Sequence, residues 1–344
     1  MMKVHFDIAH PANVHYFKNL IFLLKQRGVD IIITAKDKDL VYQLLDVYSL
    51  QYYKLGYSGK SLLHRIWFII TASIKISLLL LKEKPDISIS FGSSYCAIAA
   101  FINKIPFYVF DDTEHARLNR KIYLPLARKV FTPSSFNIDI GNKQERFKAF
   151  MELFYLHPSI FKPNEDVLKE LKIKENEKFA VIRFISWDAF HDVGINKLSN
   201  DKKEEIISIV SKYMKVFVSV EGKYPKELQK YKLTTKIQDI HSVLYYSSIY
   251  IGEGATTASE SAMLGTPAVY INKLTAGTLT DQENLKLLWQ ISNEDEIVPK
   301  LKSLLDDKNL KEKVVKNRDK MLKDLINPTE YFYKYFMSKL KNNK

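Results

Sequence analysis

Residues 249–270 read IYIGEGATTASESAMLGTPAVY, and this stretch decides the fold. A short apolar run ends in Gly252-Glu253-Gly254, small and hydroxyl residues then begin a helix, and a second apolar run follows Gly265-Thr266-Pro267. A strand, a helix and a parallel strand in this order form the repeating unit of an open α/β sheet. The segment therefore predicts a helix whose N-terminus opens directly after a buried strand.

The start of this helix is a candidate phosphate site. Gly252, Gly254 and Ala255 let a ligand approach the backbone closely, and the free amides and dipole of the first helical turn favour an anion. Thr256 and Thr257 add hydroxyl donors. Glu260, one turn further on, is placed to accept hydrogen bonds from a vicinal diol such as a ribose. The structural alternative is an ordinary capped helix with a solvated Glu260.

The same alternation runs through the chain and predicts two domains. YLHPSIFKPNE, at 155–165, contains two prolines and interrupts the pattern as an extended connection would. We predict two doubly wound, Rossmann-like parallel-sheet α/β domains that face a cleft, an N-terminal one over 1–155 and a C-terminal one over 156–325. A last helix lies within 326–344, for which packing back on the first domain is one arrangement. The predicted strands are 4–8, 31–35, 52–55, 87–91, 107–110, 129–132, 179–185, 216–220, 249–251 and 268–271.

Composition narrows the class of protein. The 344 residues are 46% hydrophobic and carry 52 basic against 39 acidic side chains, a net charge of +13. This composition excludes a disordered or collagenous chain, and the net charge favours an anionic partner, a phosphorylated metabolite or a membrane surface rather than nucleic acid, for which no binding signature appears. Alternatively, many of the lysines merely solvate helix faces, as at 308–323. The single cysteine, Cys96, fits a reducing cytoplasm, and no Cys/His spacing indicates a metal site.

Polar loops that follow predicted strands supply candidate acids and bases. Asp7, His10 and His15 follow or end the first strand, where a doubly wound domain presents ligand groups. Alternatively, Asp7 anchors its loop and His15 is an ordinary residue of the first helical turn.

The loop after the fifth strand contains three carboxylates, Asp111, Asp112 and Glu114. Since adjacent carboxylates repel, one of them can hold a proton near neutrality. A metal site built from these three residues has no defining spacing, and we predict none.

The second domain adds two cationic candidates. Arg183 and His191 lie in the stretch that closes its first strand, RFISWDAFHDVG, and could meet the charge of a diphosphate. Residues 236–241 precede another helix and are where we expect the nucleotide base to be recognised by backbone groups.

Two patterns in the chain resemble known families. G-x-G-A-x-T-x-S-E followed by A-x-L-G-x-P-A resembles the diphosphate site of the two-domain glycosyltransferase B superfamily, in particular its lipid II N-acetylglucosaminyltransferases and non-hydrolysing UDP-N-acetylglucosamine 2-epimerases. DIAHPANVHYFKN, SFGSSYCAIAA, FDDTEHA, FYLHPSIFKP and RFISWDAFHDVG together resemble the prokaryotic family called domain of unknown function 354.

The resemblance implies roles for particular residues. Gly254 to Thr257 would bind the diphosphate and Glu260 the ribose of a nucleotide sugar, UDP-linked by this similarity. Epimerases place a catalytic glutamate where Asp111 falls. They also carry Gly-Asp where this chain has Gly92-Ser93, so one expected catalytic carboxylate is missing.

An apolar stretch at 66–81 has two interpretations. At 16 residues, with Lys75 inside, it is too short to span a bilayer. It is either a crossover helix packed on the sheet, which we favour, or a segment that lies on a membrane surface together with Arg65, Lys82 and Lys84.

The combined hypothesis is a cytoplasmic glycosyltransferase, with the inner face of the membrane as a peripheral location. It would move a sugar from a nucleotide-diphosphate donor to a cell-envelope, glycolipid or polysaccharide acceptor without a further cofactor. The alternatives are a 2-epimerase acting on a nucleotide amino sugar and a non-catalytic nucleotide-sugar-binding protein.

Overall fold

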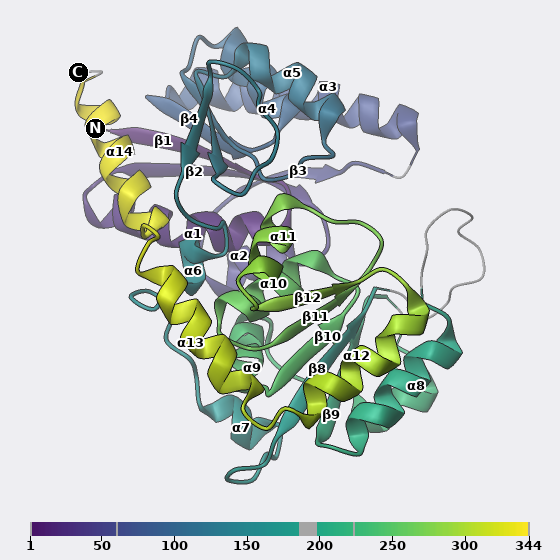
Figure 1. The fold of residues 1–344 in the computed structure, drawn as a ribbon. Coiled ribbons are helices and arrows are strands. Elements are labelled where there is room, and N and C mark those ends of the chain that lie inside the picture. Colours follow the sequence, from purple (N-terminus) through teal and green to yellow (C-terminus); the bar gives the residue numbers. More distant parts are fainter. Residues whose placement is uncertain (1, 60, 186–197, 223, 343–344) are drawn as a thin grey trace. The chain divides into compact units, whose positions relative to one another are not determined.

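The chain forms two compact units, Met1–His157 together with Ile326–Lys344, and Pro158–Leu325. The structure is a computed structural model that describes residues 2–59, 61–185, 198–222 and 224–342 (Figure 1). The division between His157 and Pro158 falls inside the proline-containing segment at 155–165. Helix α14 (Pro328–Asn342) belongs to the first unit and lies against α1 (Pro11–Gln26) and α6 (Leu153–Leu156).

Unit 1 is built on a sheet of seven parallel strands in the order β3-β2-β1-β4-β5-β6-β7. Successive strands move outward from β1 in one direction and from β4 in the other, so the strand order reverses between β1 and β4. The strands are β1 (Lys3–Ile8), β2 (Asp30–Asp37), β3 (Tyr53–Tyr57), β4 (Ile87–Phe91), β5 (Phe107–Phe110), β6 (Lys129–Pro133) and β7 (Gln144–Phe147).

Right-handed crossovers place the helices of unit 1 in two layers. α1, α2 (Val41–Val47), α6 and α14 cover one face, and α3 (Leu62–Glu83), α4 (Ser94–Ile102) and α5 (Arg117–Leu126) cover the other (Figure 1). The strands are buried on both sides, so β1 alternates apolar side chains toward α1 with the buried polar residues His5 and Asp7 toward α4.

Aromatic side chains tie α14 to the sheet of unit 1. The Phe332 ring lies 4.7 Å from that of Phe110 and 4.8 Å from that of Phe131, measured between centroids. Both arrangements are edge-to-face, which aromatic quadrupoles favour. Phe332 and Phe336 are fully buried, so the last helix completes the core of the first unit.

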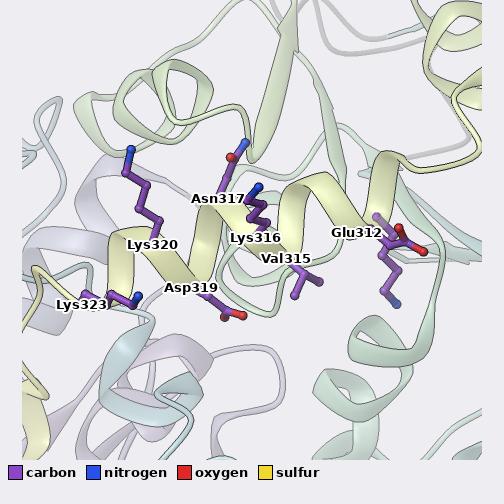
Figure 2. A pocket seen from close by; sticks show the side chains of 8 residues that line it. Glu312, Val315, Lys316, Asn317, Asp319, Lys320 and Lys323 are labelled. Atoms are coloured by element: carbon purple, nitrogen blue, oxygen red, sulfur yellow. The ribbon is translucent and has the colours of Figure 1, made fainter.

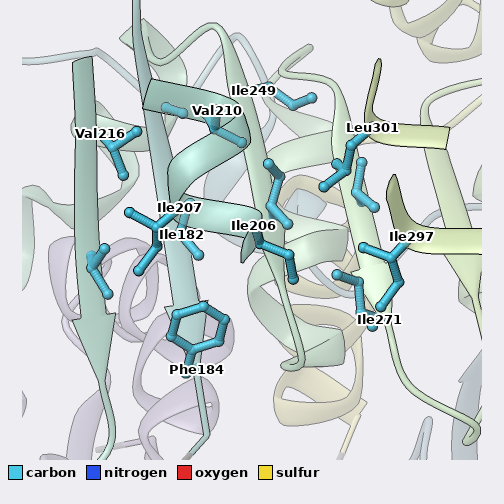
Figure 3. Packing of buried hydrophobic residues seen from close by; sticks show 14 of the residues in the cluster. Ile182, Phe184, Ile206, Ile207, Val210, Val216, Ile249, Ile271, Ile297 and Leu301 are labelled. Carbon is cyan, nitrogen blue, oxygen red and sulfur yellow. The ribbon is translucent and has the colours of Figure 1, made fainter. Parts of the chain in front are cut away.

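Unit 2 contains a five-stranded parallel sheet in the order β12-β11-β10-β8-β9. Branched aliphatic side chains of β8, β10 and α8 form its core, where Ile182, Ile206 and Ile251 are fully buried (Figure 3). Its elements are α7 (Asp166–Glu170), β8 (Phe179–Phe184), α8 (Asn200–Ser211), β9 (Lys215–Val220), η1 (Lys226–Tyr231), η2 (Ile237–Asp239), α9 (Ile240–Tyr246), β10 (Ile249–Gly252), α10 (Ala255–Met263), β11 (Ala268–Ile271), α11 (Gly277–Asn284), β12 (Leu288–Ile291), α12 (Glu294–Asp306) and α13 (Leu310–Leu322).

The predicted fold class, two parallel-sheet α/β domains, is confirmed. Sequence reasoning missed the edge strands β7 and β12, the helices α5 and α11, and the short helices α6 and α7. β7 reads QERF, and α5 carries Pro125 near its end. β7 and β12 lie at the edges of their sheets and lack a continuous apolar run. The helical pattern of α5 is interrupted by Pro125, and only one side of this helix is buried.

Truncating Phe332 to alanine should remove a central part of the unit 1 core. Because the side chain is fully buried among aromatic rings, we expect the free energy of unfolding to fall by about 3–5 kcal/mol. Urea denaturation followed by circular dichroism measures this. Lys334→Ala, on the exposed side of the same helix, is the matched control. Equal unfolding midpoints for the two variants would show that α14 is not part of the core.

Candidate functional site

The N-terminus of α10 is exposed and carries no capping side chain. Gly254 is the N-cap residue, and within the described part of the chain no side-chain cap of this helix is found. Ala255 and Thr256 are exposed and Thr257 is half-buried. The first amides of a helix need partners from outside the helix. This turn can therefore donate several hydrogen bonds to an anion.

The two glycines before α10 have different roles. A side chain at Gly252 would collide with the Tyr250 hydroxyl and would lie 2.6 Å from the carbonyl oxygen of Arg183, so this glycine is required by close packing within the unit. At Gly254 the nearest atom to an added Cβ would be the Tyr250 hydroxyl at 3.9 Å. Among the described residues, apart from the immediate chain neighbours, no other atom lies within 4 Å of that position.

Glu260 is paired with His241, which lies in the 236–241 stretch predicted for the nucleotide base but was not predicted as a partner of Glu260. The Nε2 atom of His241 lies 2.9 Å from the Oε1 atom of Glu260, and both side chains are buried. His241 comes from α9, the helix next to α10. This contact fixes the orientation of the carboxyl group, so Glu260 is not the solvated residue of the structural alternative.

Two carboxylates organise the end of β8. Arg183 forms an ion pair with Glu221, 2.9 Å between Nη2 and Oε1, on the surface of unit 2. Glu253 is buried and accepts hydrogen bonds from the backbone amides of Ile185 and Leu198. Glu253 was not predicted as functional, and here it joins the described residues on either side of 186–197. His191 lies outside the described residues.

Unit 2 has two cavities that are not lined by residues of α10. One, of about 900 Å³, follows α13 and is lined by lysines as well as Glu312 and Asp319 (Figure 2). The other, of about 230 Å³, lies at the carboxyl ends of β11 and β12 and includes Asn272. The lining of neither cavity includes a residue predicted for the site.

In unit 1, Asp7 ends a buried row of polar groups that crosses the sheet. The Oγ1 atom of Thr34 donates to the Oδ1 atom of Asp7 at 2.8 Å, and His5 Nε2 lies 2.9 Å from the same Oγ1. His5 Nδ1 lies 2.8 Å from Ser88 Oγ, which in turn is 3.4 Å from Cys96 Sγ. Burial raises the pKa of Asp7 to about 6, while hydroxyl groups, that of Thr34 first, oppose the rise.

The chemistry of these groups gives the row a direction. A carboxylate only accepts, so Thr34 must donate to Asp7 and accept from His5. Burial lowers the pKa of His5 to about 3, so the imidazole is neutral, carries its hydrogen on Nε2 and accepts at Nδ1 from Ser88. The Ser88 hydroxyl then accepts from the Cys96 thiol. Every donor in the row points toward Asp7, which stabilises its ionised form.

The two candidate histidines of the first loop have structural contacts. The Nδ1 atom of His10 accepts a hydrogen bond from the Ala12 amide at 3.2 Å and caps α1. The neutral ring then carries its hydrogen on Nε2, which makes His10 a better hydrogen-bond donor than a base. His15 is buried and stacks on Tyr155, with ring centroids 5.2 Å apart. His15 is part of the aromatic packing around α1.

Asp111 is held by several donors. Its Oδ2 atom accepts from the Arg120 guanidinium at 3.2 Å and from the Tyr123 hydroxyl, and its Oδ1 atom accepts from the Thr113 amide at 2.8 Å. Burial nevertheless raises the pKa of Asp111, with these donors opposing it. The arrangement is that of an anchor for the loop after β5, and Arg120 and Tyr123 were not predicted as its partners.

Asp112 has the more unusual environment. Burial, followed by repulsion from Asp111, raises the pKa of Asp112 to about 7. Its Oδ1 atom accepts from the Thr113 hydroxyl at 3.1 Å. Glu114 instead accepts from the Asn137 amide at 2.8 Å. Among the residues that the structure describes, no three His, Cys, Asp or Glu side chains are gathered as metal ligands. Asp112 is therefore the carboxyl group of this loop best able to exchange a proton near neutral pH.

The chain, with its two parallel-sheet α/β units, has the fold of solved structures of the glycosyltransferase B type, among them UDP-GlcNAc 2-epimerases and a MurG. The chain belongs to the family described as protein of unknown function DUF354, whose sequence model matches residues 2–333.

Three relatives show the range of this similarity. An uncharacterised protein of Methanocaldococcus jannaschii is 24% identical over 294 residues, 78% of this chain and 81% of its own length. A UDP-N-acetylglucosamine–N-acetylmuramyl-(pentapeptide) pyrophosphoryl-undecaprenol N-acetylglucosamine transferase of Sulfurihydrogenibium sp. is 23% identical over 283 residues, 78% and 73% of the two chains. The crystal structure of UDP-GlcNAc 2-epimerase from Neisseria meningitidis bound to UDP-GlcNAc superposes with a TM-score of 0.70 at 14% identity, covering 99% of this chain and 100% of that one.

Replacing Thr34 by valine should raise the pKa of Asp7 further above 6. The substitution keeps the shape but removes the hydroxyl that donates to the carboxylate. Titration of the Asp7 carboxyl carbon by NMR measures the change. Thr34→Ser retains the hydroxyl and is the control. If valine and serine gave the same titration curve, the directed row would have no influence on Asp7.

Replacing Asp112 by asparagine should alter how stability depends on pH. The folded-state pKa of about 7 lies above the ordinary value of 3.8, so the wild type loses stability as the pH rises from 4 to 7. Asp112→Asn removes this loss. A pKa of about 7 against 3.8 would correspond to about 4 kcal/mol over this pH range, but Asp112 is partly exposed and solvent screens the effect. We therefore expect the unfolding free energy of the variant at pH 8, relative to pH 4, to exceed that of the wild type by about 2 kcal/mol.

Urea denaturation at a series of pH values measures this difference. Asp324→Asn, at an exposed position, is the control. Parallel pH profiles for Asp112→Asn and the wild type would mean that Asp112 titrates normally.

Proposed function

We propose that this protein is a glycosyltransferase that uses a nucleotide-diphosphate sugar as donor. The observation that carries the proposal is the uncapped, exposed N-terminus of α10, together with the oriented carboxyl group of Glu260 one turn further along the same helix. The exposed amides and the Glu260 carboxyl group are about one helical turn apart along α10, which suits a ligand in which a diphosphate is followed by a ribose. The transferase relative and the structural similarity to an epimerase bound to UDP-GlcNAc support a UDP-linked donor.

In this proposal the helix stabilises the leaving group. The bond between the sugar C1 and the diphosphate oxygen breaks, and the negative charge that develops on the diphosphate is met by the amides of Ala255 to Thr257. The acceptor oxygen forms the new bond to C1 and gives its proton to a base. Asp112 is the first candidate for this base, because Asp111 is saturated by donors and His10 caps a helix.

The acceptor is proposed as a cell-envelope, glycolipid or polysaccharide hydroxyl. The transferase relative is named for a substrate linked to pyrophosphoryl-undecaprenol, which favours a lipid-linked acceptor for this chain as well. A cytoplasmic site of action fits such a donor and acceptor. No further cofactor is needed for the proposed reaction.

Epimerisation of a nucleotide amino sugar at C2 is the second candidate. The acidic run from Asp111 to Glu114 and the similarity to the Neisseria epimerase favour it. Ser93, which caps α4 where the epimerase pattern has a carboxylate, argues against it. A binding protein without turnover is the third reading, because the fold alone does not establish a reaction.

One experiment separates these three functions. The protein is incubated with UDP-N-acetylglucosamine in deuterated water, and the anomeric and C2 protons are followed by NMR. A transferase leaves C2 unexchanged and forms product only when an acceptor such as an undecaprenyl-linked sugar is added. Exchange at C2 without an acceptor identifies an epimerase, and line broadening with no new product under either condition identifies a binding protein.

Glu260→Gln should weaken nucleotide binding without unfolding the domain. Glutamine keeps the shape of the side chain and can still meet His241, but a neutral amide accepts a weaker hydrogen bond from a ribose hydroxyl than a carboxylate does. We expect the dissociation constant for UDP, measured by calorimetry, to rise by about tenfold. Glu312→Gln, exposed on α13, is the matched control. Unchanged affinity in Glu260→Gln would remove the ribose role of Glu260.

A further inference from the structure

Helix α3 of unit 1 is apolar on two opposite sides. One side packs on the sheet and on α4 through Phe68, Ala72, Ile76 and Leu80, which are all buried. This confirms that α3 is a crossover helix packed on the sheet, but packing explains only half of its apolar surface. The opposite side consists of large apolar residues that are exposed, at positions 62, 63, 66, 67, 70, 74, 78 and 81.

The exposed residues form one continuous stripe. Positions 63, 67, 70, 74, 78 and 81 follow one another at intervals of three and four, which places them on a single side of an α-helix. Leu63 is 78% exposed and Trp67 65% exposed. A soluble helix normally turns this side to water with polar residues, so a stripe of this length marks an interaction site.

Neighbouring helices extend the stripe into a wider surface. α4 lies beside α3, where the Asn103 amide donates to the Ser77 hydroxyl at 2.8 Å, and it ends in the exposed Phe101 and Ile102. α5 lies beside α4 and exposes Leu118, at 79%, and Ile122. All three helices belong to the same layer of unit 1 (Figure 1). We call the exposed apolar residues of α3, α4 and α5 the α3 face.

Charged residues around the α3 face are almost all of one sign. Glu83 is the one acidic residue in α3, α4 and α5, and it is half-buried and paired with Lys3 at 2.9 Å. The exposed cations in or directly after these helices are Arg65, Lys75, Lys82, Lys84, Lys104, Arg117, Lys121 and Arg128. An apolar stripe bordered by lysine and arginine matches a bilayer surface, where acyl chains lie beneath anionic headgroups.

We propose that the α3 face docks the protein on an anionic membrane surface. Charge selects this partner over a second copy of the chain, because two copies meeting through this face would bring their cations together. Within the described residues, no helix is long and apolar enough to cross a membrane, so α3 would lie along the interface. Trp67 would then sit at headgroup level, where tryptophan is favoured.

Vesicle binding tests the proposal without any nucleotide sugar, so its result is independent of the proposed reaction. The full chain is mixed with vesicles of phosphatidylglycerol and phosphatidylcholine, or of phosphatidylcholine alone. We expect sedimentation with the anionic vesicles, a blue shift of tryptophan emission, and binding that weakens as salt is added.

Two variants locate the contact. Leu63→Glu combined with Leu78→Glu places carboxylates in the stripe while keeping Trp67, and should lower vesicle affinity by more than tenfold. Leu274→Glu changes a leucine of unit 2 that is 65% exposed, and should bind as the wild type does. Matching circular dichroism spectra and melting temperatures show that both variants are folded.

Several results would overturn the proposal. These are no sedimentation with anionic vesicles, equal binding to phosphatidylcholine alone, or an unchanged affinity in the double variant. Concentration-dependent dimerisation that the double variant abolishes, measured by light scattering, would assign the α3 face to a second copy. Binding of an acidic protein at the same face with no vesicle binding would assign it to a protein partner.

Discussion

The parallel direction of every strand is the constraint on which the candidate sites depend. In both sheets the carboxyl ends of the strands meet at one edge, so the loops that follow them are neighbours even when they are far apart in sequence. In unit 1 this rule places the ends of β1, β4 and β5 side by side, and in unit 2 it aligns the start of α10 with the ends of β8 and β11. A helix that starts at this edge directs its amides toward whatever binds there.

The hydrogen bonds that each carboxyl group accepts distinguish three aspartates that look equivalent in the sequence. Asp7, Asp111 and Asp112 all follow or end strands, yet Asp111 meets four donors, Asp7 receives a directed row of them, and Asp112 is repelled by its neighbour. The same logic separates the glycines of Gly-Glu-Gly. Gly252 is needed for packing, whereas the described residues leave open space beside Gly254. Chemistry near neutral pH falls to groups whose partners are incomplete or of like charge.

The structure shows on which helices part of the net charge of +13 lies. Lysines on α13 lie beside Glu312 and Asp319, whereas α3, α4 and α5 carry exposed cations with Glu83 as their one acidic residue. A phosphorylated donor and an anionic surface both suit a basic protein. We propose different units for these two attractions, α10 in unit 2 for the donor and the α3 face in unit 1 for the surface.

The sequence by itself determined the two-domain α/β fold and the helix that opens at Gly254, because hydrophobic periodicity and glycine placement are local properties of the chain. It missed β7 and β12, which are short and lie at sheet edges. Tertiary structure alone decided that His241 orients Glu260, that Arg120 and Tyr123 occupy Asp111, and that His5 reaches Asp7 through Thr34. These contacts join side chains from different helices, strands and loops. Which side chains pair, how deeply they are buried and therefore what pKa they have depend on which elements pack together.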